Sequence, residues 1–223
     1  MNGESPEITV ALIDDQDLFR AGLQVIIDAQ PGMRVVGSAG DGRDGLALVD
    51  RVDPDVVLMD IRMPELDGVE ATRQIFSADR VAARRRPIRV IVLTTFNLDD
   101  RAATAIRHGA SGFLLKDTTP AMLVNAIQTV YAGNAVLAPD DLATLLASPF
   151  PVQQPQPAAY QTLSEKERVV FVAVAEGLSN TEVAARIYAS ESTVKTHVGA
   201  ILRKLSLRDR VQIVVYAHEH GLV

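Results

Sequence analysis

Four short apolar runs of the chain are each followed directly by polar or charged residues. Each run is rich in Val, Ile and Leu, which is typical of strands buried on both faces of a parallel sheet. The five residues are Asp14, Asp15, Asp60, Thr94 and Lys116. Because parallel sheets bind ligands at the carboxyl ends of their strands, we expect these side chains to meet at one edge of a sheet.

The grouping of three carboxylates with an ammonium and a hydroxyl group indicates phosphoryl chemistry. Carboxylates that crowd together raise each other's pKa and require a cation, and Mg²⁺ prefers such oxygen ligands. One carboxylate can also act as the nucleophile of a phosphoryl transfer. Asp60 is the candidate, because it stands alone after its strand, whereas Asp14 and Asp15 are adjacent and can share the metal. Lys116 and Thr94 suit the accessory role.

The segments that carry these residues alternate between strand and helix patterns, in five pairs within about 130 residues. This alternation predicts an α/β fold: a doubly wound, five-stranded parallel sheet of the flavodoxin-like type with right-handed crossovers. The predicted strands are residues 8–13, 34–38, 56–59, 88–94 and 112–115, and the predicted helices are residues 17–29, 42–52, 68–77, 98–108 and 120–132.

The C-terminal part has helical patterns throughout. The stretches at 164–167 and 179–182 fit the S-x-x-E capping box, and Gly177 fits the end of the first helix. Helices at 181–187 and 191–205, joined by a turn at 188–190, have the dimensions of a helix-turn-helix, followed by a last helix at 209–218. The helix at 191–205 has an apolar side and a small, polar, basic side suited to a DNA groove. The apolar side is Val194, Val198, Ile201, Leu202 and Leu205, and the other side is Ser192, Thr196, Gly199 and Arg203, with Lys195 at the flank.

Composition and charge are consistent with two separate domains. The segment 148–157, with four prolines and three glutamines, reads as an extended linker. We predict a domain at 1–132, a linker at 133–159 that includes a short helix at 140–147, and an all-α domain at 160–223. The net charge of −6 divides into −7 for residues 1–159, with 14 basic and 21 acidic residues, and +1 for residues 160–223, with 8 and 7. The acidity therefore belongs to the N-terminal part and does not argue against nucleic-acid binding by the C-terminal part.

Several classes of protein are disfavoured by composition. The absence of cysteine excludes disulfides, thiolate chemistry and zinc-finger sites. No apolar run approaches the roughly 20 residues of a membrane span, and residues 1–7 lack the pattern of an export signal. We expect a soluble, cytoplasmic protein without a membrane partner.

The N-terminal part resembles the receiver domain of bacterial two-component response regulators. The resemblance covers about residues 8–132 and rests on Asp14-Asp15, L-M-D-I-R-M-P at 58–64, D-G at 67–68, Thr94 and Lys116. It implies that Asp60 accepts a phosphoryl group from a sensor histidine kinase. It also implies that Asp15, Asp60 and the backbone carbonyl of Arg62 bind Mg²⁺, with Asp14 assisting through water. A further implication is that Thr94 and Phe113 move together as a switch on phosphorylation.

The C-terminal part resembles the LuxR-type DNA-binding domain over residues 162–223. The resemblance rests on T-L-S-E-K-E-R at 162–168, E-G-L-S-N-T-E-V-A at 176–184, S-T-V-K-T-H-V at 192–198 and I-L-R-K-L at 201–205. A receiver joined to such a domain defines the NarL/FixJ family. The implied base contacts are from Lys195 and Thr196, and the implied phosphate contacts are from Asn180, Thr193, Arg203 and Lys204. The implied dimer contacts are from Val211, Val214 and Val215; the alternative for this apolar stripe is packing onto the helical core of its own domain.

The combined resemblance predicts a transcriptional regulator rather than an enzyme. Its chemistry would be limited to its own Mg²⁺-dependent phosphoryl transfer and slow dephosphorylation. Phosphorylation would promote homodimerisation and binding to double-stranded promoter DNA. The alternative is a phosphorylation-independent regulator whose receiver serves as a dimerisation or ligand-sensing module.

Two enzyme or cofactor classes fit the sequence less well. A phosphohydrolase with an aspartate nucleophile generally has a second acid two residues further on, and that position is Arg62. A dinucleotide-binding domain would need G-x-G-x-x-G, which Gly37, Gly40 and Gly42 do not form.

Overall fold

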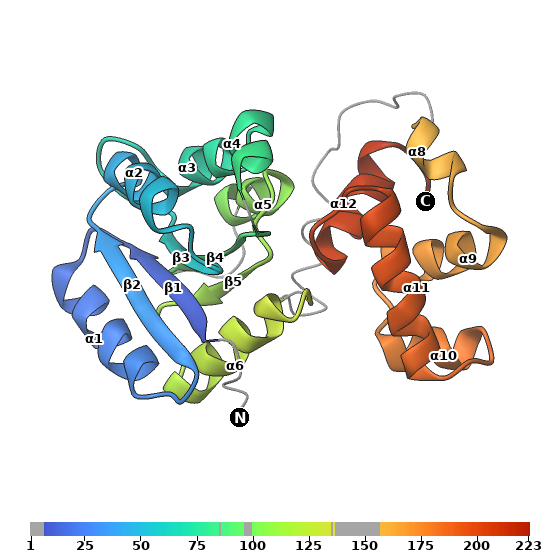
Figure 1. Ribbon diagram of the computed structural model, residues 1–223, viewed down its shortest axis with the longest axis horizontal. Helices are drawn as coiled ribbons and strands as arrows, with labels where there is room; N and C mark the ends of the chain where they lie inside the picture. Colours follow the sequence, from blue (N-terminus) through green and yellow to red (C-terminus); the bar gives the residue numbers. More distant parts are fainter. Residues whose placement is uncertain (1–6, 85, 96–99, 135, 137–156) are drawn as a thin grey trace, which may run out of the picture. The chain divides into compact units, whose positions relative to one another are not determined.

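The computed structural model describes residues 7–84, 86–95, 100–134, 136 and 157–223. The chain divides into two compact units, residues 1–136 and 137–223. Figure 1 shows that the first unit is an α/β structure and that the second is helical. In these described ranges, no helix is long and apolar enough to cross a membrane.

The first unit contains a five-stranded parallel sheet with the order β2-β1-β3-β4-β5. This confirms the predicted doubly wound α/β fold. Its strands are β1 Ile8–Ile13, β2 Met33–Ala39, β3 Val56–Asp60, β4 Arg89–Thr94 and β5 Gly112–Leu115. Its helices are α1 Asp17–Asp28, α2 Gly42–Val52, α3 Gly68–Ile75, α4 Ala78–Ala83, α5 Asp100–Arg107 and α6 Pro120–Tyr131.

Helices cover both faces of this sheet. Figure 1 shows α1 and α6 on one face and α2, α3, α4 and α5 on the other. On the first face, Leu23 and Ile27 of α1 and Leu123 and Ile127 of α6 pack against buried strand residues such as Leu58. Burial from both sides explains why β3 reads as an uninterrupted apolar run up to its last residue.

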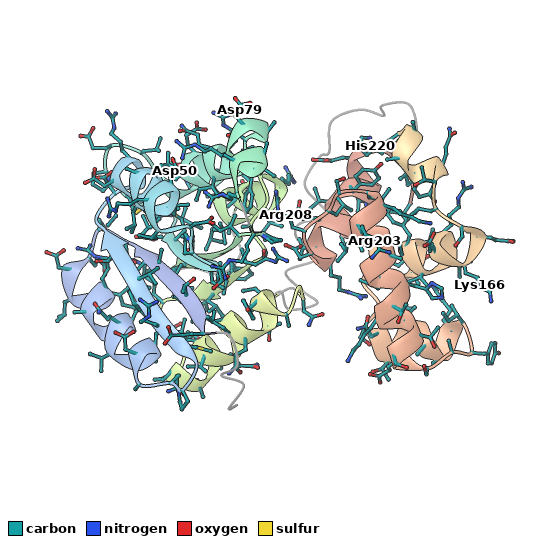
Figure 2. The ribbon with its side chains drawn as sticks, in the orientation of Figure 1. Asp50, Asp79, Lys166, Arg203, Arg208 and His220 are labelled. Carbon is teal, nitrogen blue, oxygen red and sulfur yellow. The ribbon has the colours of Figure 1, made fainter. Side chains whose placement is uncertain are left out.

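Helix α4 was not predicted from the sequence. The predicted helix at 68–77 ends earlier, at Ile75, and α4 follows it. Ion pairs attach this region to α2. Arg80 of α4 binds Asp50 of α2, and Nη1 of Arg84, directly after α4, lies 3.2 Å from Oδ1 of Asp53, directly after α2. Figure 2 labels Asp50 and Asp79 in this region. Tertiary ion pairs therefore hold a six-residue helix that local propensity alone does not specify.

Some predicted elements fall partly or wholly outside the described residues. Helix α5 begins at Asp100 in the structure, and the first two residues of the predicted helix at 98–108 are not described. The predicted helix at 140–147 and nearly all of the proline- and glutamine-rich segment also lie outside the described ranges.

The second unit is helical, as predicted. Both capping boxes are present: Ser164 and Ser179 each accept a hydrogen bond from the third residue of a helix, and Glu167 and Glu182 bind back. Gly177 has a φ of +89°, which a helix-ending glycine adopts without strain. The helices are α8 Ala158–Gln161, which was not predicted, α9 Glu165–Ala175, α10 Asn180–Arg186, α11 Glu191–Lys204 and α12 Arg210–Glu219.

An ion pair links the start of α9 to the end of α11. Nζ of Lys204 lies 2.6 Å from Oε2 of Glu167, which also accepts from the backbone N–H of Ser164 at 2.6 Å. The hydrogen bond from Lys204, followed by the bond from Ser164, lowers the pKa of Glu167 to about 2. The ionised form of Glu167 is therefore favoured in the folded state.

This shift predicts a pH dependence of stability. A lowered carboxyl pKa contributes stability that is present above the ordinary value of 4.5 and is lost as the pH falls towards 2. We expect Glu167→Gln to lower the free energy of unfolding of the C-terminal unit by about 1 kcal/mol at pH 7, because Gln keeps the cap but loses the ion pair. The difference should shrink below pH 4.5. Calorimetry of the full chain between pH 2 and 7 tests this, with exposed Glu165→Gln as the control. A difference that is constant with pH would contradict the prediction.

Candidate functional site

The predicted site lies at the carboxyl edge of the sheet. Asp60 is the last residue of the central strand β3, and Thr94 is the last residue of the neighbouring strand β4. Asp14 follows β1 on the other side of β3, and Lys116 follows β5. The parallel register places Leu93 opposite Asp60 and so aligns the strand ends. The sheet topology therefore positions residues from four separated parts of the chain.

Lys116 bridges two buried carboxylates at this edge. Its Nζ lies 2.7 Å from Oδ2 of Asp14 and 2.9 Å from Oδ2 of Asp60. The other oxygens accept backbone N–H bonds: Oδ1 of Asp60 from Arg62 at 3.3 Å, and Oδ1 of Asp14 from Gln16 at 2.9 Å. Both carboxylates are thus held in fixed orientations.

The environment shifts the pKa values in directions that reflect this geometry. Burial raises the pKa of Asp60; the hydrogen bond from Lys116 opposes that rise, and the charge of Asp14 adds to it. Burial alone would lower the pKa of Lys116, but the bonds and charges of Asp14 and Asp60 raise it above the ordinary value. The ammonium of Lys116 therefore remains charged at neutral pH.

The same edge has the donor set of a hard cation. Ligand oxygens of Asp14, Asp15 and Asp60 lie within 4.8 Å of one another, and Asp15 is exposed whereas the other two are buried. Three carboxylates with one ammonium leave a net charge of about −2, which a divalent cation would balance. Among the described residues, this is the one such acidic group.

The two residues of the predicted switch lie on adjacent strands. Thr94 is 5% exposed at the end of β4, and Phe113 is 8% exposed on β5. Phe113 pairs with Val92, two residues before Thr94, so the two side chains lie on the same face of the sheet. The backbone N–H of Lys116 donates to the carbonyl of Thr94 at 2.7 Å, which ties the two strand ends together.

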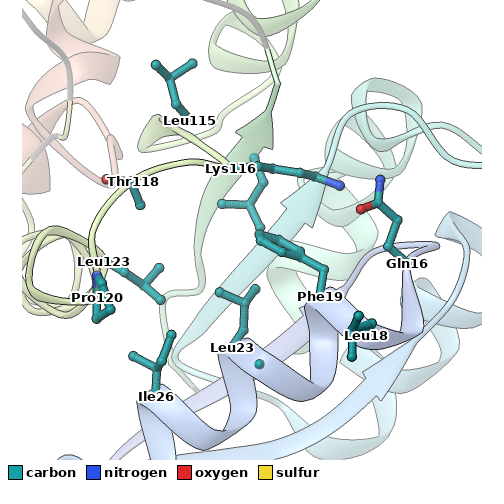
Figure 3. A pocket seen from close by; sticks show the side chains of 12 residues that line it. Gln16, Leu18, Phe19, Leu23, Ile26, Leu115, Lys116, Thr118, Pro120 and Leu123 are labelled. Atoms are coloured by element: carbon teal, nitrogen blue, oxygen red, sulfur yellow. The ribbon is translucent and has the colours of Figure 1, made fainter.

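Phe19 is a site residue that the sequence did not reveal. Its ring centroid lies 5.0 Å from Nζ of Lys116, within the range of a cation–π interaction. Figure 3 shows Phe19, from α1, beside the Lys116 side chain, with Gln16 near its amine. These residues border an apolar cavity of about 480 Å³ between α1 and the segment after β5. In the sequence, Phe19 is one apolar residue of a predicted helix, and nothing distinguishes it there from an ordinary core residue.

The loop after Asp60 is fixed by two close backbone approaches. A Cβ on Gly68 would lie 1.9 Å from the carbonyl oxygen of Asp60, and one on Gly42 would lie 2.3 Å from that of Leu66. The N–H of Gly68 donates to the carbonyl of Ile61 at 3.0 Å. The missing side chains allow the loop to fold back on the end of β3, which fixes the backbone that carries Asp60.

The helical unit presents the predicted helix-turn-helix. Helix α11 buries Val194 and Ile201 in the core of this unit. The predicted polar side is exposed, and Figure 2 shows Arg203 on this helix. The exposed residues of α11 are Glu191, Ser192, Thr193, Lys195, Thr196, Gly199, Arg203 and Lys204.

Two residues expected to contact DNA phosphates have partners within the unit. Lys204 is bound to Glu167 and also donates to the carbonyl of Thr162 at 3.1 Å. Oδ1 of Asn180 accepts from Nη1 of Arg210 at 2.9 Å. A phosphate contact from Lys204 would have to compete with its ion pair, so its predicted role is less well supported than that of Arg203.

Most of helix α12 is buried, including the residues of the predicted dimer contact. Ile213, Tyr216 and Ala217 belong to the core cluster of the unit. The expected dimer residues occupy other positions of the same helix. They are Val211, Val214 and Val215, and each is 3% exposed, so a dimer contact through them requires that they first become accessible.

Comparison with known proteins agrees with this architecture. Residues 10–128 match the family model of the response regulator receiver domain, and residues 161–217 match that of the bacterial regulatory proteins of the luxR family. The chain is 40% identical over 219 residues to the uncharacterized transcriptional regulatory protein YxjL of Bacillus subtilis, covering 97% of this chain and 98% of that protein. It is 33% identical to the nitrate/nitrite response regulator protein NarL of Escherichia coli, covering 100% of both.

A solved structure shows the same likeness. The response regulator ChrA of a heme-sensing two-component system is 32% identical, with a TM-score of 0.51, covering 98% of this chain and 100% of that one. The chain therefore belongs to the response regulators that join a receiver domain to a LuxR-type DNA-binding domain. It is a transcriptional regulator of the family that includes NarL.

Proposed function

We propose that Asp60 is the phosphoryl acceptor of this regulator and that a sensor histidine kinase is the donor. An oxygen of the Asp60 carboxylate would attack phosphorus, and the P–N bond of the phosphohistidine would break as the new P–O bond forms. The observation that supports this best is Lys116, whose ammonium lies 2.9 Å from Asp60. An ammonium at that distance can stabilise the negative charge of the phosphoryl oxygens after the group is transferred to Asp60.

The other residues of the edge have supporting roles in this proposal. Thr94 would donate its hydroxyl to a phosphoryl oxygen, and Phe113 would fill the space that Thr94 leaves when it moves. The added negative charge would shift a pre-existing equilibrium between two arrangements of β4, β5 and the helices beside them.

Mg²⁺ fits the oxygen donors of this site. Asp15, Asp60 and the backbone carbonyl of Arg62 would hold it, with Asp14 assisting through water. When bound, it would neutralise charge on the transferred group. Lys116 already offsets part of the charge of Asp14 and Asp60, so a single divalent ion suffices to balance the three carboxylates.

The output of the switch would be a dimer bound to promoter DNA. Lys195 and Thr196, exposed on α11, would read bases, while Asn180, Thr193 and Arg203 would contact phosphates. Val211, Val214 and Val215 of α12, which are buried in this structure, would become accessible on phosphorylation and form the dimer contact. Two linked domains bind paired half-sites more tightly than one, because the second binding event is effectively intramolecular.

Phosphorylation should therefore increase DNA affinity. We expect at least a tenfold gain when the full chain is treated with acetyl phosphate and Mg²⁺, since dimerisation adds a second domain to the same duplex. Fluorescence anisotropy on a duplex that the protein selects from a random pool measures the affinity. Sedimentation under the same conditions measures the oligomeric state. Equal affinity and an unchanged mass with and without the donor would favour the phosphorylation-independent regulator.

A further inference from the structure

Arg210 connects the start of α12 to the start of α10. It is the first residue of α12 and lies 30 residues after Asn180 in the chain. Nη1 of Arg210 donates to Oδ1 of Asn180 at 2.9 Å, and Nη2 donates to the backbone carbonyl of Leu178. The guanidinium therefore binds both the backbone just before α10 and the side chain of the first residue of α10.

This contact fixes the orientation of the Asn180 amide. A guanidinium group can only donate hydrogen bonds, and an asparagine side chain has a single acceptor atom, its oxygen. The oxygen must therefore face Arg210, which leaves the two N–H donors of the amide at the other end of the group. Asn180 is half-buried, so these donors remain within reach of a ligand at the surface.

The start of α10 is also tied to the helix that carries the predicted base contacts. Oγ1 of Thr181 donates to Oε1 of Glu191, the first residue of α11, at 2.7 Å. The start of α10 is thus linked to α12 through Arg210 and to α11 through Thr181. These two links set the position of Asn180 relative to the exposed Lys195 on α11.

We propose that Arg210 is a positioning residue for DNA binding: by holding the oxygen of Asn180, it directs the amide donors of Asn180 to a DNA phosphate. This inference rests on the proposed DNA-binding function. Arg210 acts through Asn180 and does not itself contact the phosphate.

A double-mutant cycle on the full chain tests the proposal. Affinity is measured for the duplex selected by the wild-type protein, in the presence of acetyl phosphate and Mg²⁺. We expect Asn180→Ala to weaken binding about fivefold, as for the loss of one neutral hydrogen bond. Arg210→Ala should weaken it to a similar extent, and the double variant should bind no more weakly than Arg210→Ala. Additive losses would overturn the proposal.

Salt dependence separates positioning from direct contact. The slope of log affinity against log salt concentration is negative, and loss of a cation that touches a phosphate lowers its magnitude by about 0.9. We expect Arg210→Ala to leave this slope unchanged, because the contact is made by a neutral amide. Arg203→Ala serves as the control that lowers its magnitude. A slope of lower magnitude for Arg210→Ala would show a direct contact and contradict the positioning role.

A phosphate-by-phosphate scan adds a readout that a general loss of stability would not move. Single phosphates of the duplex are replaced by neutral methylphosphonates. One phosphate should be found whose replacement weakens binding by the wild-type protein but not by Asn180→Ala. Replacing that phosphate should not weaken binding by Arg210→Ala either. Retention of the effect in Arg210→Ala would overturn the proposal.

Two further variants keep the test independent of folding. Arg210→Lys retains the charge but cannot make both hydrogen bonds of the guanidinium. This variant should bind DNA with intermediate affinity, and its melting temperature should equal that of the wild-type protein. Asn180→Asp strengthens the contact to Arg210 but removes the donors, so its DNA affinity should fall below that of Asn180→Ala while its stability is retained. Wild-type affinity in Asn180→Asp would refute the donor role. Failure of the wild-type chain to bind any duplex would instead refute the proposed function.

Discussion

Replacing Asp60 by Asn should abolish the phosphoryl gain of the intact chain. The amide is nearly isosteric with the carboxylate but lacks the anionic oxygen that attacks phosphorus. Intact mass after incubation with acetyl phosphate and Mg²⁺ measures the outcome directly. The wild-type chain should gain one phosphoryl group, and Asp60→Asn should gain none. We also expect the DNA affinity of Asp60→Asn to be insensitive to the phosphodonor.

The loss should come from chemistry rather than from unfolding. Asp60 is 4% exposed, and burial raises its pKa, so a neutral side chain at this position is not expected to destabilise the fold. Lys116 also contacts Asp14, at 2.7 Å, and the substitution leaves both of these side chains in place. Asp117→Asn is the matched control, because Asp117 is exposed and follows Lys116 directly. Labelling of Asp60→Asn at the wild-type rate would place the acceptor elsewhere.

Gly68→Ala should damage both the stability and the chemistry of the receiver. The added Cβ would lie 1.9 Å from the carbonyl oxygen of Asp60 and 3.1 Å from Cα of Ile61. Both neighbours are backbone atoms, so relief requires the loop to move away from β3. We expect a loss of about 2 kcal/mol in the free energy of unfolding of the N-terminal unit. Because a displacement of about 1 Å at a reacting group can cost roughly 100-fold in rate, phosphorylation should slow by a similar factor.

Gly22→Ala is the matched control for Gly68→Ala. Gly22 is an exposed residue within α1, and nothing lies within 4 Å of its added Cβ. Alanine in a helix interior is favoured over glycine by about 0.5–1 kcal/mol, so this variant should be slightly stabilised. Chemical denaturation and the initial rate of phosphoryl gain compare the two variants. Unchanged values for Gly68→Ala would show that the close approach does not constrain the site.

Much of the fold could be predicted because the local signals agree with it. Buried parallel strands are mostly apolar, so β1, β3, β4 and β5 are visible as runs rich in Val, Ile and Leu. The capping residues Ser164 and Ser179 predicted the starts of α9 and α10, and the structure has both capping boxes. Helices α4 and α8 were missed because each is short and depends on its surroundings rather than on a long periodic pattern.

The candidate site could be predicted only in part. Strand ends that share an edge bring Asp14, Asp60 and Lys116 together, and that follows from strand order. The approach of Phe19 to Lys116 depends on how α1 packs against the sheet, which periodicity does not encode. The pairing of Lys204 with Glu167 likewise joins residues 37 positions apart, so no local pattern shows that this lysine is occupied.

By itself, the sequence determined the type of fold, the family, and the residue types at the carboxyl edge of the sheet. These depend on periodicity, capping and motif spacing, which are local properties of the chain. Tertiary structure decided which oxygen each cation binds, how closely Gly68 approaches Asp60, and that Arg210 holds Asn180. Such contacts depend on angstrom-scale packing between segments that are distant in sequence, and packing of that kind is fixed only when the whole unit folds.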